Sequence, residues 1–264
     1  MLKIDDLFNI LNEIAPIELS YKCIEKGDYD NSGIIVRSHE KVEKILFSLD
    51  LSLAATAKAK RLGCDTIVTH HPAIYYPVKS LSEKDMVTAP IIKAAENKLN
   101  VISMHLNLDV AADGTDASLC KGLGGEKYRI LDRLTEKEGY GREFSFPPVT
   151  LSEFVNKIKK EFKTNRVIVY GNRKSVIDKA ASFCGGGASY AEKAVNEGKT
   201  DAKVIITSDM PHHVIKELVE NGRSVILLTH YSAENYGFNL FSERAGEKLK
   251  LKAETFVFND KRFM

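Results

Sequence analysis

Residues 44–72 read KILFSLDLSLAATAKAKRLGCDTIVTHHP, and this stretch decides the fold. Its first apolar run, KILFSL, predicts a buried strand, because a strand covered on both faces is continuously hydrophobic. The next stretch has a helical pattern that ends at Gly63, a residue type favoured just after a helix end. A second apolar run at 66–69 then leads directly into His70 and His71. The order strand, helix, strand predicts parallel strands joined by a covering helix.

The same alternation continues through the rest of the chain. Residues 89–100 predict a helix, and residues 101–104 predict a strand that leads into His105. Further on, predicted strands and helices alternate in the order strand 179–184, helix 188–198, strand 203–207, helix 212–222 and strand 224–229. The sequence therefore predicts an α/β fold of two similar halves related by a pseudo-repeat, with largely parallel sheets flanked by helices. We place the first half at 1–126 and the second at 127–264.

The segment between the two repeats is expected to open the second half. Residues 127–134 resemble a strand and are followed by a turn region that contains Gly, Arg and Pro and ends in Phe-Pro-Pro at 146–148. A helix is predicted at 150–162, because Thr150 and Glu153 form a capping-box pattern at its start. A further strand is predicted at 166–171, and the first residues of the chain have helical spacing.

Composition and charge exclude several classes of protein. The 264 residues are 44% hydrophobic and 28% charged, which is typical of a folded globular chain. No apolar run approaches the roughly 20 residues that a membrane helix needs. The formal net charge of +2 gives little support to a nucleic-acid partner. The amino terminus lacks the pattern of a signal peptide, so we expect a cytoplasmic protein.

The four cysteines are predicted to be reduced and buried. Cys23, Cys64, Cys120 and Cys184 lie far apart and form no Cys-x-x-Cys pair. This spacing fits small apolar side chains better than a disulfide framework or a thiolate metal site.

Conspicuous polar residues follow three predicted strands. His70 and His71 follow one strand, His105 with Asp109 follows another, and His230 with Glu234 follows a third. Ligands of α/β proteins bind beyond the carboxyl ends of the strands. A histidine and a carboxylate four residues apart share one face of a helix, so both can reach one ion.

This supply of ligands predicts a dinuclear metal site. A single histidine at a strand end is most simply a hydrogen-bonded structural residue, but three such ends favour metal binding. Four histidines and two carboxylates exceed what one tetrahedral zinc ion takes. They suit two divalent ions such as Zn, Fe, Mn, Co or Ni.

Five motifs carry a resemblance to a known family. They are Asp30-Asn31-Ser32-Gly33, Thr69-His70-His71-Pro72, His105-Leu106-Asn107-Leu108-Asp109 with Gly114, Gly185-Gly186-Gly187, and His230-Tyr231-Ser232-Ala233-Glu234. With these motifs in order over nearly the whole chain, the sequence resembles the Nif-three-like family of dinuclear metal centre proteins, often labelled GTP cyclohydrolase I type 2 homologues.

The resemblance implies a ligand set and an assembly. The implied metal ligands are His70, His71, Asp109, His230 and Glu234, with Glu234 bridging the two ions. His105 is either a further ligand or a residue that orients Asp109 or a bound water. The resemblance also implies a ring-shaped homohexamer whose sites face an internal cavity.

Metal-assisted hydrolysis of a small molecule is the first functional hypothesis. Two divalent ions lower the pKa of water and stabilise the charge of a hydrolytic transition state. A phosphoester, a nucleotide or a cyclic amidine such as the imidazole ring of a purine would suit this chemistry, with Glu234 as the catalytic residue. The family label nominates the last of these, with GTP as substrate. The alternative is a non-catalytic ring that carries or senses metal, or docks onto another protein. A ring threaded by nucleic acid is a third reading, which the net charge of +2 supports weakly.

Each of three further features has two possible interpretations. His212 and His213, which follow Ser208-Asp209, either bind a third ion or line the pocket near the start of a helix. The glycines at 185–187 either form a tight turn or bind an anion through their backbone amides. Tyr75, Tyr76 and Lys79 either cover the site or lie in an exposed loop. Asn31 is a further residue that could approach the metals.

Overall fold

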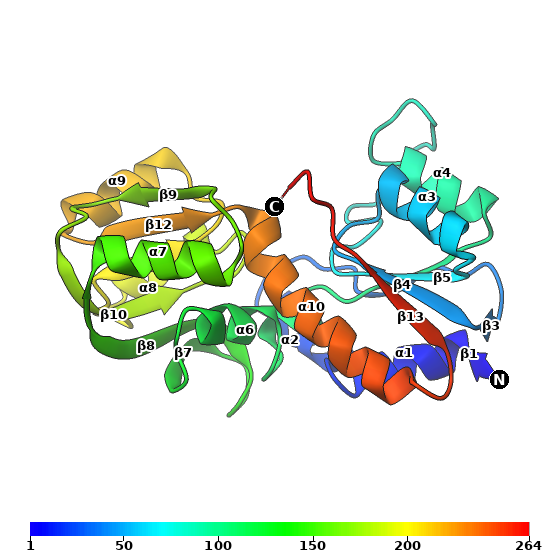
Figure 1. The fold of residues 1–264 in the computed structure, drawn as a ribbon, viewed down its shortest axis with the longest axis horizontal. Helices are drawn as coiled ribbons and strands as arrows, with labels where there is room; N and C mark the ends of the chain where they lie inside the picture. Colours follow the sequence, from blue (N-terminus) through cyan, green and yellow to red (C-terminus); the bar gives the residue numbers. More distant parts are fainter. Residues whose placement is uncertain (264) are drawn as a thin grey trace. The chain divides into compact units, whose positions relative to one another are not determined.

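The chain packs as two compact units, each formed from two separate segments of sequence. The computed structural model describes residues 1–263 (Figure 1). Unit 1 comprises Met1–Leu108 and Phe238–Asn259, and unit 2 comprises Asp109–Gly237 and residues 260–263. The boundary near residue 126, which was inferred from the sequence repeat, stays a prediction.

Unit 1 is built on a five-stranded sheet in the order β13-β4-β5-β6-β2. The strands β13, β4, β5 and β6 run parallel, and β2 joins the edge of β6 antiparallel. A separate antiparallel pair is formed by β1 and β3. The elements of unit 1 are β1 (Leu2–Lys3), α1 (Ile4–Asn12), α2 (Ile17–Glu25), β2 (Gly33–Val36), β3 (Lys41–Val42), β4 (Lys44–Ser48), α3 (Leu53–Leu62), β5 (Thr66–Thr69), α4 (Ala89–Glu96), β6 (Asn100–Ser103), the start of α5 (Leu106–Val110), the later part of α10 (His230–Leu249) and β13 (Glu254–Phe258).

Alternate side chains of the unit 1 strands enter two cores, one on each face of the sheet. Leu46 of β4 packs with Ala59 of α3 and Ala94 of α4 in one hydrophobic cluster. Phe47, the next residue, faces the other side, because side chains alternate along a strand. There its ring lies 6.4 Å from the ring of Phe238 in α10. Since both faces are covered, the strands are apolar at successive positions.

The carboxyl end of α3 follows the sequence prediction, and its start has a side-chain cap. Ser52 caps the start of the helix, and its hydroxyl accepts a hydrogen bond from the backbone N–H of Ala55. Gly63 ends the helix in the left-handed conformation, with φ of 69°. A side chain at this position would be strained, so glycine is the favoured residue.

Unit 2 is built on a six-stranded sheet in the order β7-β8-β10-β11-β12-β9. The strands β10, β11 and β12 run parallel, while β7, β8 and β9 pair antiparallel. The elements of unit 2 are the end of α5, α6 (Thr115–Gly122), β7 (Tyr128–Arg133), β8 (Gly139–Thr150), α7 (Leu151–Glu161), β9 (Val167–Tyr170), β10 (Val176–Ser182), α8 (Ala188–Asn196), β11 (Val204–Thr207), α9 (His212–Glu220), β12 (Ser224–Leu228) and the start of α10.

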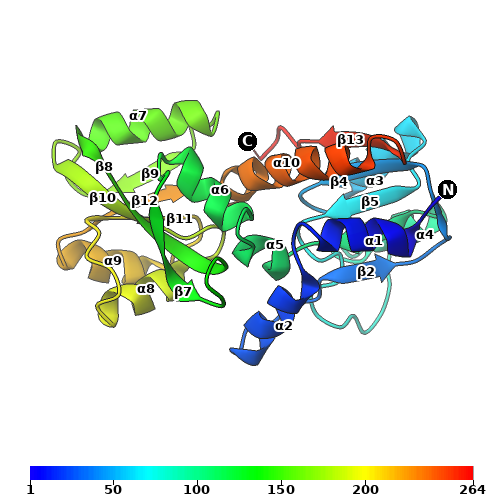
Figure 2. The same cartoon turned by 90° about the horizontal axis from the view of Figure 1, so that it is seen from below.

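The unit 2 sheet also separates two cores. Ile205 of β11 packs with Ala191 of α8 and Leu218 of α9. The next residue, Ile206, packs on the opposite face with Phe154 of α7. Figure 2 shows α7 on one side of this sheet and α8 and α9 on the other. The unit is therefore a three-layer α/β/α arrangement.

The prediction of a turn region before the helix at 150–162 is wrong. The structure has a 12-residue strand there, β8, which pairs antiparallel with both β7 and β10. Pro147 and Pro148 lie where the pairing of β8 with β10 changes register. A register shift needs no regular ladder of hydrogen bonds, so prolines are tolerated at that point. The prolines therefore mark an irregularity within a long strand.

The two units share a core of four strands with the same topology, which confirms the predicted fold of two similar halves. In unit 1, three parallel strands are connected through α3 and α4, and β2 lies antiparallel beyond the last of them. In unit 2, three parallel strands are connected through α8 and α9, and β9 takes the place of β2. The flanking strands differ, since β13 extends one sheet and β8 with β7 extends the other. The sequence patterns did not predict β13.

A buried ion pair fixes one corner of unit 2. Asp116 of α6 and Arg142 of β8 form a salt bridge, and both side chains are fully buried. The other oxygen of Asp116 accepts a hydrogen bond of 2.9 Å from the backbone N–H of Cys184. The guanidinium of Arg142 also lies over the ring of Tyr128. Asp116 thus ties α6, β8 and the residues that follow β10 to one another.

The cysteines and the helices agree with what the sequence predicts of them. All four cysteines are buried, and burial raises the pKa of the Cys120 thiol to about 12. Over residues 1–263, no helix combines the length and the apolarity needed to cross a bilayer.

Replacing Asp116 with alanine should lower the free energy of unfolding by about 3–5 kcal/mol, because Arg142 would stay buried without its counter-charge. Denaturant unfolding followed by circular dichroism measures this loss. Asp201→Ala, which removes the exposed partner of Lys179 in the same unit, is the control and should leave stability nearly unchanged. Equal losses in the two variants would contradict the role assigned to the buried pair.

Candidate metal centre

Three histidines of unit 1 meet at the carboxyl ends of neighbouring strands. His70 and His71 follow β5, and His105 follows β6 after one intervening residue. One ring nitrogen from each histidine lies within 4.8 Å of the other two. His70 is fully buried, while His71 and His105 are partly buried. This grouping is a candidate site for a metal ion, as the sequence predicted for the first two residues.

Each of these three rings is held through its Nδ1 atom by an oxygen. The Nδ1 of His70 lies 2.8 Å from the carbonyl oxygen of Met104. The Nδ1 of His71 lies 2.6 Å from a carboxylate oxygen of Asp50, and that of His105 lies 2.7 Å from Asp30. When Nδ1–H donates to an oxygen, Nε2 carries the lone pair that binds a metal.

Asp30 is itself fixed as an ionised carboxylate. Burial acts to raise its pKa, but hydrogen bonds from His105, Ser20 and Ser32 outweigh burial and hold the pKa below its usual value. The side chain of the next residue, Asn31, donates to the carbonyl oxygen of Ile74 at 2.5 Å. Asn31 therefore anchors the loop that follows His71, and Asp30 is the residue of this motif that reaches a histidine.

Unit 2 brings together His230, Glu234 and Asp109, which are residue types that bind metals in proteins. Helix α10 begins at His230, so His230 and Glu234 share one face, and the His230 Nε2 lies 2.9 Å from Glu234 Oε1. This confirms the predicted helical turn after the strand. One carboxylate oxygen of Asp109 lies within 4.8 Å of one from Glu234. Both carboxylates are buried. The hydroxyl of Thr115 donates to Asp109 and orients it.

The fourth histidine is oriented as the others are. The Nδ1 of His230 lies 2.5 Å from Asp209, which follows β11. Asp30, Asp50 and Asp209 therefore perform the same task for three different histidines. Local sequence patterns give Asp50 no role, and they place Asp209 only near the start of a helix.

Gly185 provides the space that Glu234 occupies. A Cβ at Gly185 would collide with Glu234 Oε1, and the φ of this glycine is +62°. A side chain here would be strained and would also displace the carboxylate. The carboxylate of the buried Asp116 accepts a hydrogen bond from the backbone N–H of Cys184, the residue before Gly185. This hydrogen bond holds the glycine turn in place. The glycine run thus shapes the carboxylate environment.

The remaining predicted residues take other positions. His212 and His213 form the first turn of α9 and are exposed, and none of the candidate metal groups among residues 1–263 includes them. The ring of Tyr75 packs 5.8 Å from the ring of His105. Tyr76 and Lys79 lie in the exposed part of the same loop.

The donor chemistry of both groups fits divalent ions of the borderline class. Imidazole nitrogens and carboxylate oxygens are the ligands that Zn, Fe, Mn, Co and Ni take in proteins. Hydrogen-bonded carboxylates behind the imidazoles raise the basicity of a ligand and fix its orientation. The side chains are therefore suited to hold metal ions that activate water or polarise a substrate.

Known proteins resemble this chain over nearly its whole length. A family model described as Duf34/NIF3 (NGG1p interacting factor 3) matches residues 2–262. A relative from Clostridium perfringens, described as "GTP cyclohydrolase 1 type 2 homolog", is 29% identical over 260 residues, covering 97% of this chain and 96% of that protein. One from Clostridium acetobutylicum with the same description is 31% identical over 238 residues, covering 88% of this chain and 85% of that protein.

Solved structures share the fold. A hypothetical protein from Staphylococcus aureus has a TM-score of 0.85 at 24% identity, covering 98% of this chain and 97% of that chain. Reduced HcgD from Methanocaldococcus jannaschii has a TM-score of 0.79 at 25% identity, covering 98% of both chains. These matches agree with the mixed α/β architecture described above.

Gly185→Ala should weaken metal binding about 10–100-fold, the range seen when the support of a ligand is lost. The added methyl group would displace Glu234. Competition with a chromophoric chelator measures the affinity, and circular dichroism checks that the variant folds. Gly186→Ala is the matched control, because a Cβ there meets nothing within 4 Å. Unchanged affinity in a folded Gly185→Ala variant would refute this role of Gly185.

Proposed function

The chain belongs to the Duf34/NIF3 family, and we propose that it is a divalent-metal-dependent hydrolase acting on a nucleotide or another phosphoester. The proposed ligands of two divalent ions per chain are His70, His71, Asp109, His230 and Glu234. His105 is either a further ligand or a residue that orients one of them.

The observation that carries this proposal is the support behind the imidazoles. Each of the four candidate histidines has an oxygen within 2.8 Å of its Nδ1, and for three of them that oxygen belongs to a carboxylate. The four are His70, His71, His105 and His230. Structural histidines need no such common arrangement. Histidines that bind metal almost always have it, because the second hydrogen bond fixes which nitrogen faces the ion.

The side chains of the site would have different roles in hydrolysis. Two bound divalent ions would supply Lewis acidity and lower the pKa of water. Glu234 is the proposed bridging ligand and catalytic residue, and it is buried, so its charge is poorly screened by solvent. Thr115 holds Asp109, and Asp209 holds His230, which keeps these groups in place without reorganisation.

GTP is a narrower candidate substrate than the phosphoester class. The description "GTP cyclohydrolase 1 type 2 homolog" belongs to relatives such as the Clostridium perfringens protein. Opening a purine ring would require groups that recognise guanine and bind a triphosphate, in addition to the metal ligands. We therefore propose the broader class and treat GTP as one member of the substrate panel.

The proposed assembly is a homohexameric ring in the cytoplasm, without a nucleic-acid partner. The loop after β5 exposes apolar side chains that a neighbouring copy of the chain would cover in such a ring. They are Val78, Leu81, Met86 and Val87. Sedimentation velocity of the purified chain measures its oligomeric state.

Elemental analysis of protein purified without chelators should find two divalent ions per chain. Glu234→Ala should lose bound metal and lower the rate of phosphoester hydrolysis at least about a hundredfold, since the metals supply several kcal/mol of transition-state stabilisation. Hydrolysis of p-nitrophenyl phosphate, nucleoside phosphates and GTP by the metal-loaded protein gives the rates.

Glu243→Ala is the matched control, because Glu243 is an exposed glutamate of the same helix. It should keep both the metal content and the rate. Full turnover by Glu234→Ala would overturn the enzymatic proposal. Two bound ions with no turnover on any substrate would favour the non-catalytic ring.

A further inference from the structure

Three tyrosine rings of unit 1 pack together beside the candidate metal centre. They belong to Tyr29, which lies in the segment between α2 and β2, and to Tyr75 and Tyr76 in the loop after β5. Their ring centroids lie 4.6–5.1 Å apart. The ring of Tyr75 also lies 5.8 Å from the imidazole of His105, with an angle of 89° between the two planes. We call these three residues the tyrosine cluster.

Two rings of the tyrosine cluster are open to solvent. Tyr76 is 63% exposed and Tyr29 is 41% exposed, whereas Tyr75, which contacts His105, is partly buried. Tyr21 and Tyr170 are also exposed, but within residues 1–263 neither packs against another aromatic ring. Aromatic rings gain stability from burial, so a contiguous group of exposed rings is typical of a binding site.

The cluster is held in place by its backbone. The hydroxyl of Tyr75 donates to the carbonyl oxygen of Tyr29 at 2.9 Å, and the side chain of Asn31 donates to the carbonyl oxygen of Ile74 at 2.5 Å. These two bonds join the segment after α2 to the loop after β5. A surface that is already ordered loses little conformational freedom when a ligand binds.

The position and the chemistry of the cluster suit the base of a nucleotide. An aromatic side chain stacks on any nucleobase, because every base has a π face. Only the ring of Tyr75 separates the ring of Tyr76 from His105 in this series of contacts. In a nucleotide a ribose separates the base from the phosphate. Its base can therefore lie on the cluster while its phosphoryl group reaches the histidines.

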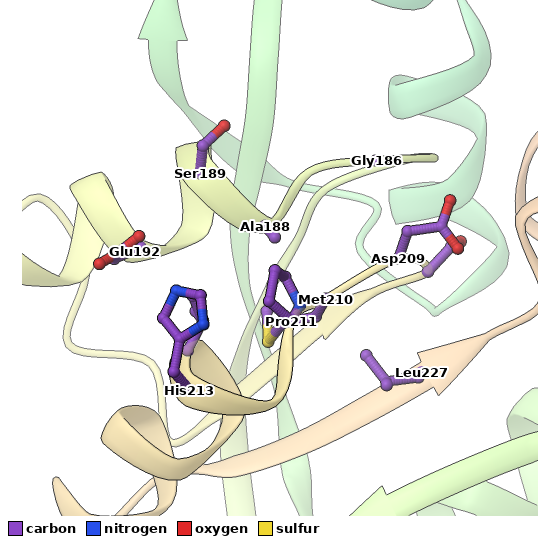
Figure 3. Close-up of a pocket in the computed structure, with 11 residues that line it drawn as sticks. Gly186, Ala188, Ser189, Glu192, Asp209, Met210, Pro211, His213 and Leu227 are labelled. Atoms are coloured by element: carbon purple, nitrogen blue, oxygen red, sulfur yellow. The ribbon is translucent and has the colours of Figure 1, made fainter.

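The open pocket of unit 2 lacks these features (Figure 3). None of the 11 lining residues drawn there is a phenylalanine or a tyrosine. Glu192 and Asp209 contribute carboxylates to this lining, and carboxylates repel a phosphate. The tyrosine cluster is therefore the better match to a nucleotide.

We propose that the tyrosine cluster binds the base of a nucleotide whose phosphoryl group lies at His70, His71 and His105. This inference rests on the proposed function and narrows it from phosphoesters in general to nucleotides. Tyr76 and Tyr29 supply the stacking surface and so determine specificity. Tyr75 sets the spacing between the base and the histidines.

Isothermal titration of the full chain loaded with Zn²⁺ tests this proposal. The probes are the methylenephosphonate analogues of adenosine monophosphate and of ribose 5-phosphate, in which a carbon replaces the ester oxygen and prevents hydrolysis. The two probes differ only in the base. We expect the adenosine analogue to bind about tenfold more tightly, since one stack of a base on an aromatic side chain has about this effect.

Variants of the exposed tyrosines assign the preference to the cluster. Tyr76→Ala should weaken binding of the adenosine analogue about tenfold, and Tyr29→Ala should weaken it in the same direction. Neither should change binding of the ribose analogue, whereas damage to the metal centre would weaken both probes. Tyr76→Phe keeps the ring and should bind as wild type does. Tyr21→Ala is the matched control, because Tyr21 is a 56% exposed tyrosine of α2 outside the cluster.

The proposal would be overturned by equal binding of the two analogues to wild type, or by unchanged binding of the adenosine analogue to Tyr76→Ala. If sedimentation velocity then showed a changed oligomeric state for Tyr76→Ala, the ring would belong to a subunit contact instead. No binding of either analogue would overturn both this inference and the proposed function. The expected binding without hydrolysis of adenosine monophosphate or of any other nucleotide would overturn the hydrolase proposal alone.

Discussion

The register of the parallel strands is the constraint on which the candidate metal centre depends. In unit 1, Thr69 of β5 is level with Ser48 of β4 and with Ser103 of β6. The residues that follow these strands therefore leave the sheet at one edge, which brings Asp50 and the histidines together. One residue of slip would move a strand by about 3.3 Å and turn its side chains to the other face. The 2.6 Å contact between His71 and Asp50 would then be lost.

The same arrangement of aspartate and histidine occurs in both units. In each case an aspartate after one parallel strand holds the Nδ1 of a histidine after the next strand, and the two residues are 21 positions apart. The pairs are Asp50 with His71 and Asp209 with His230. This separation is the length of one helical crossover between neighbouring strands. It follows that a parallel sheet places a metal ligand and its supporting carboxylate side by side without any irregular loop.

Much of the fold, and the grouping of histidines at the strand ends, could be predicted because both depend on local patterns. Apolar runs predict the central strands. The residues that follow these runs include the candidate metal ligands His70, His71, His105 and His230. Tertiary contacts carried the rest. Asp30 supports His105 from 75 positions away, and no local pattern signals that contact. The strand β8 was missed because its prolines are tolerated only where β10 changes register. The spacing of 21 residues was present in the sequence, but it gains meaning only once the strands are known to be neighbours.

The two halves keep the same strands but use the equivalent strand end differently. In unit 1 the residues after Thr69 are His70 and His71, whereas in unit 2 the residues after Thr207 are Ser208 and Asp209. A pair of candidate metal ligands is thus replaced by a buried hydroxyl and a carboxylate that supports a histidine. Asp209 lies 2.5 Å from the Nδ1 of His230, so this strand end holds a candidate ligand in place instead of supplying one. Divergence of the repeat therefore kept the backbone at this strand end and changed what its side chains do.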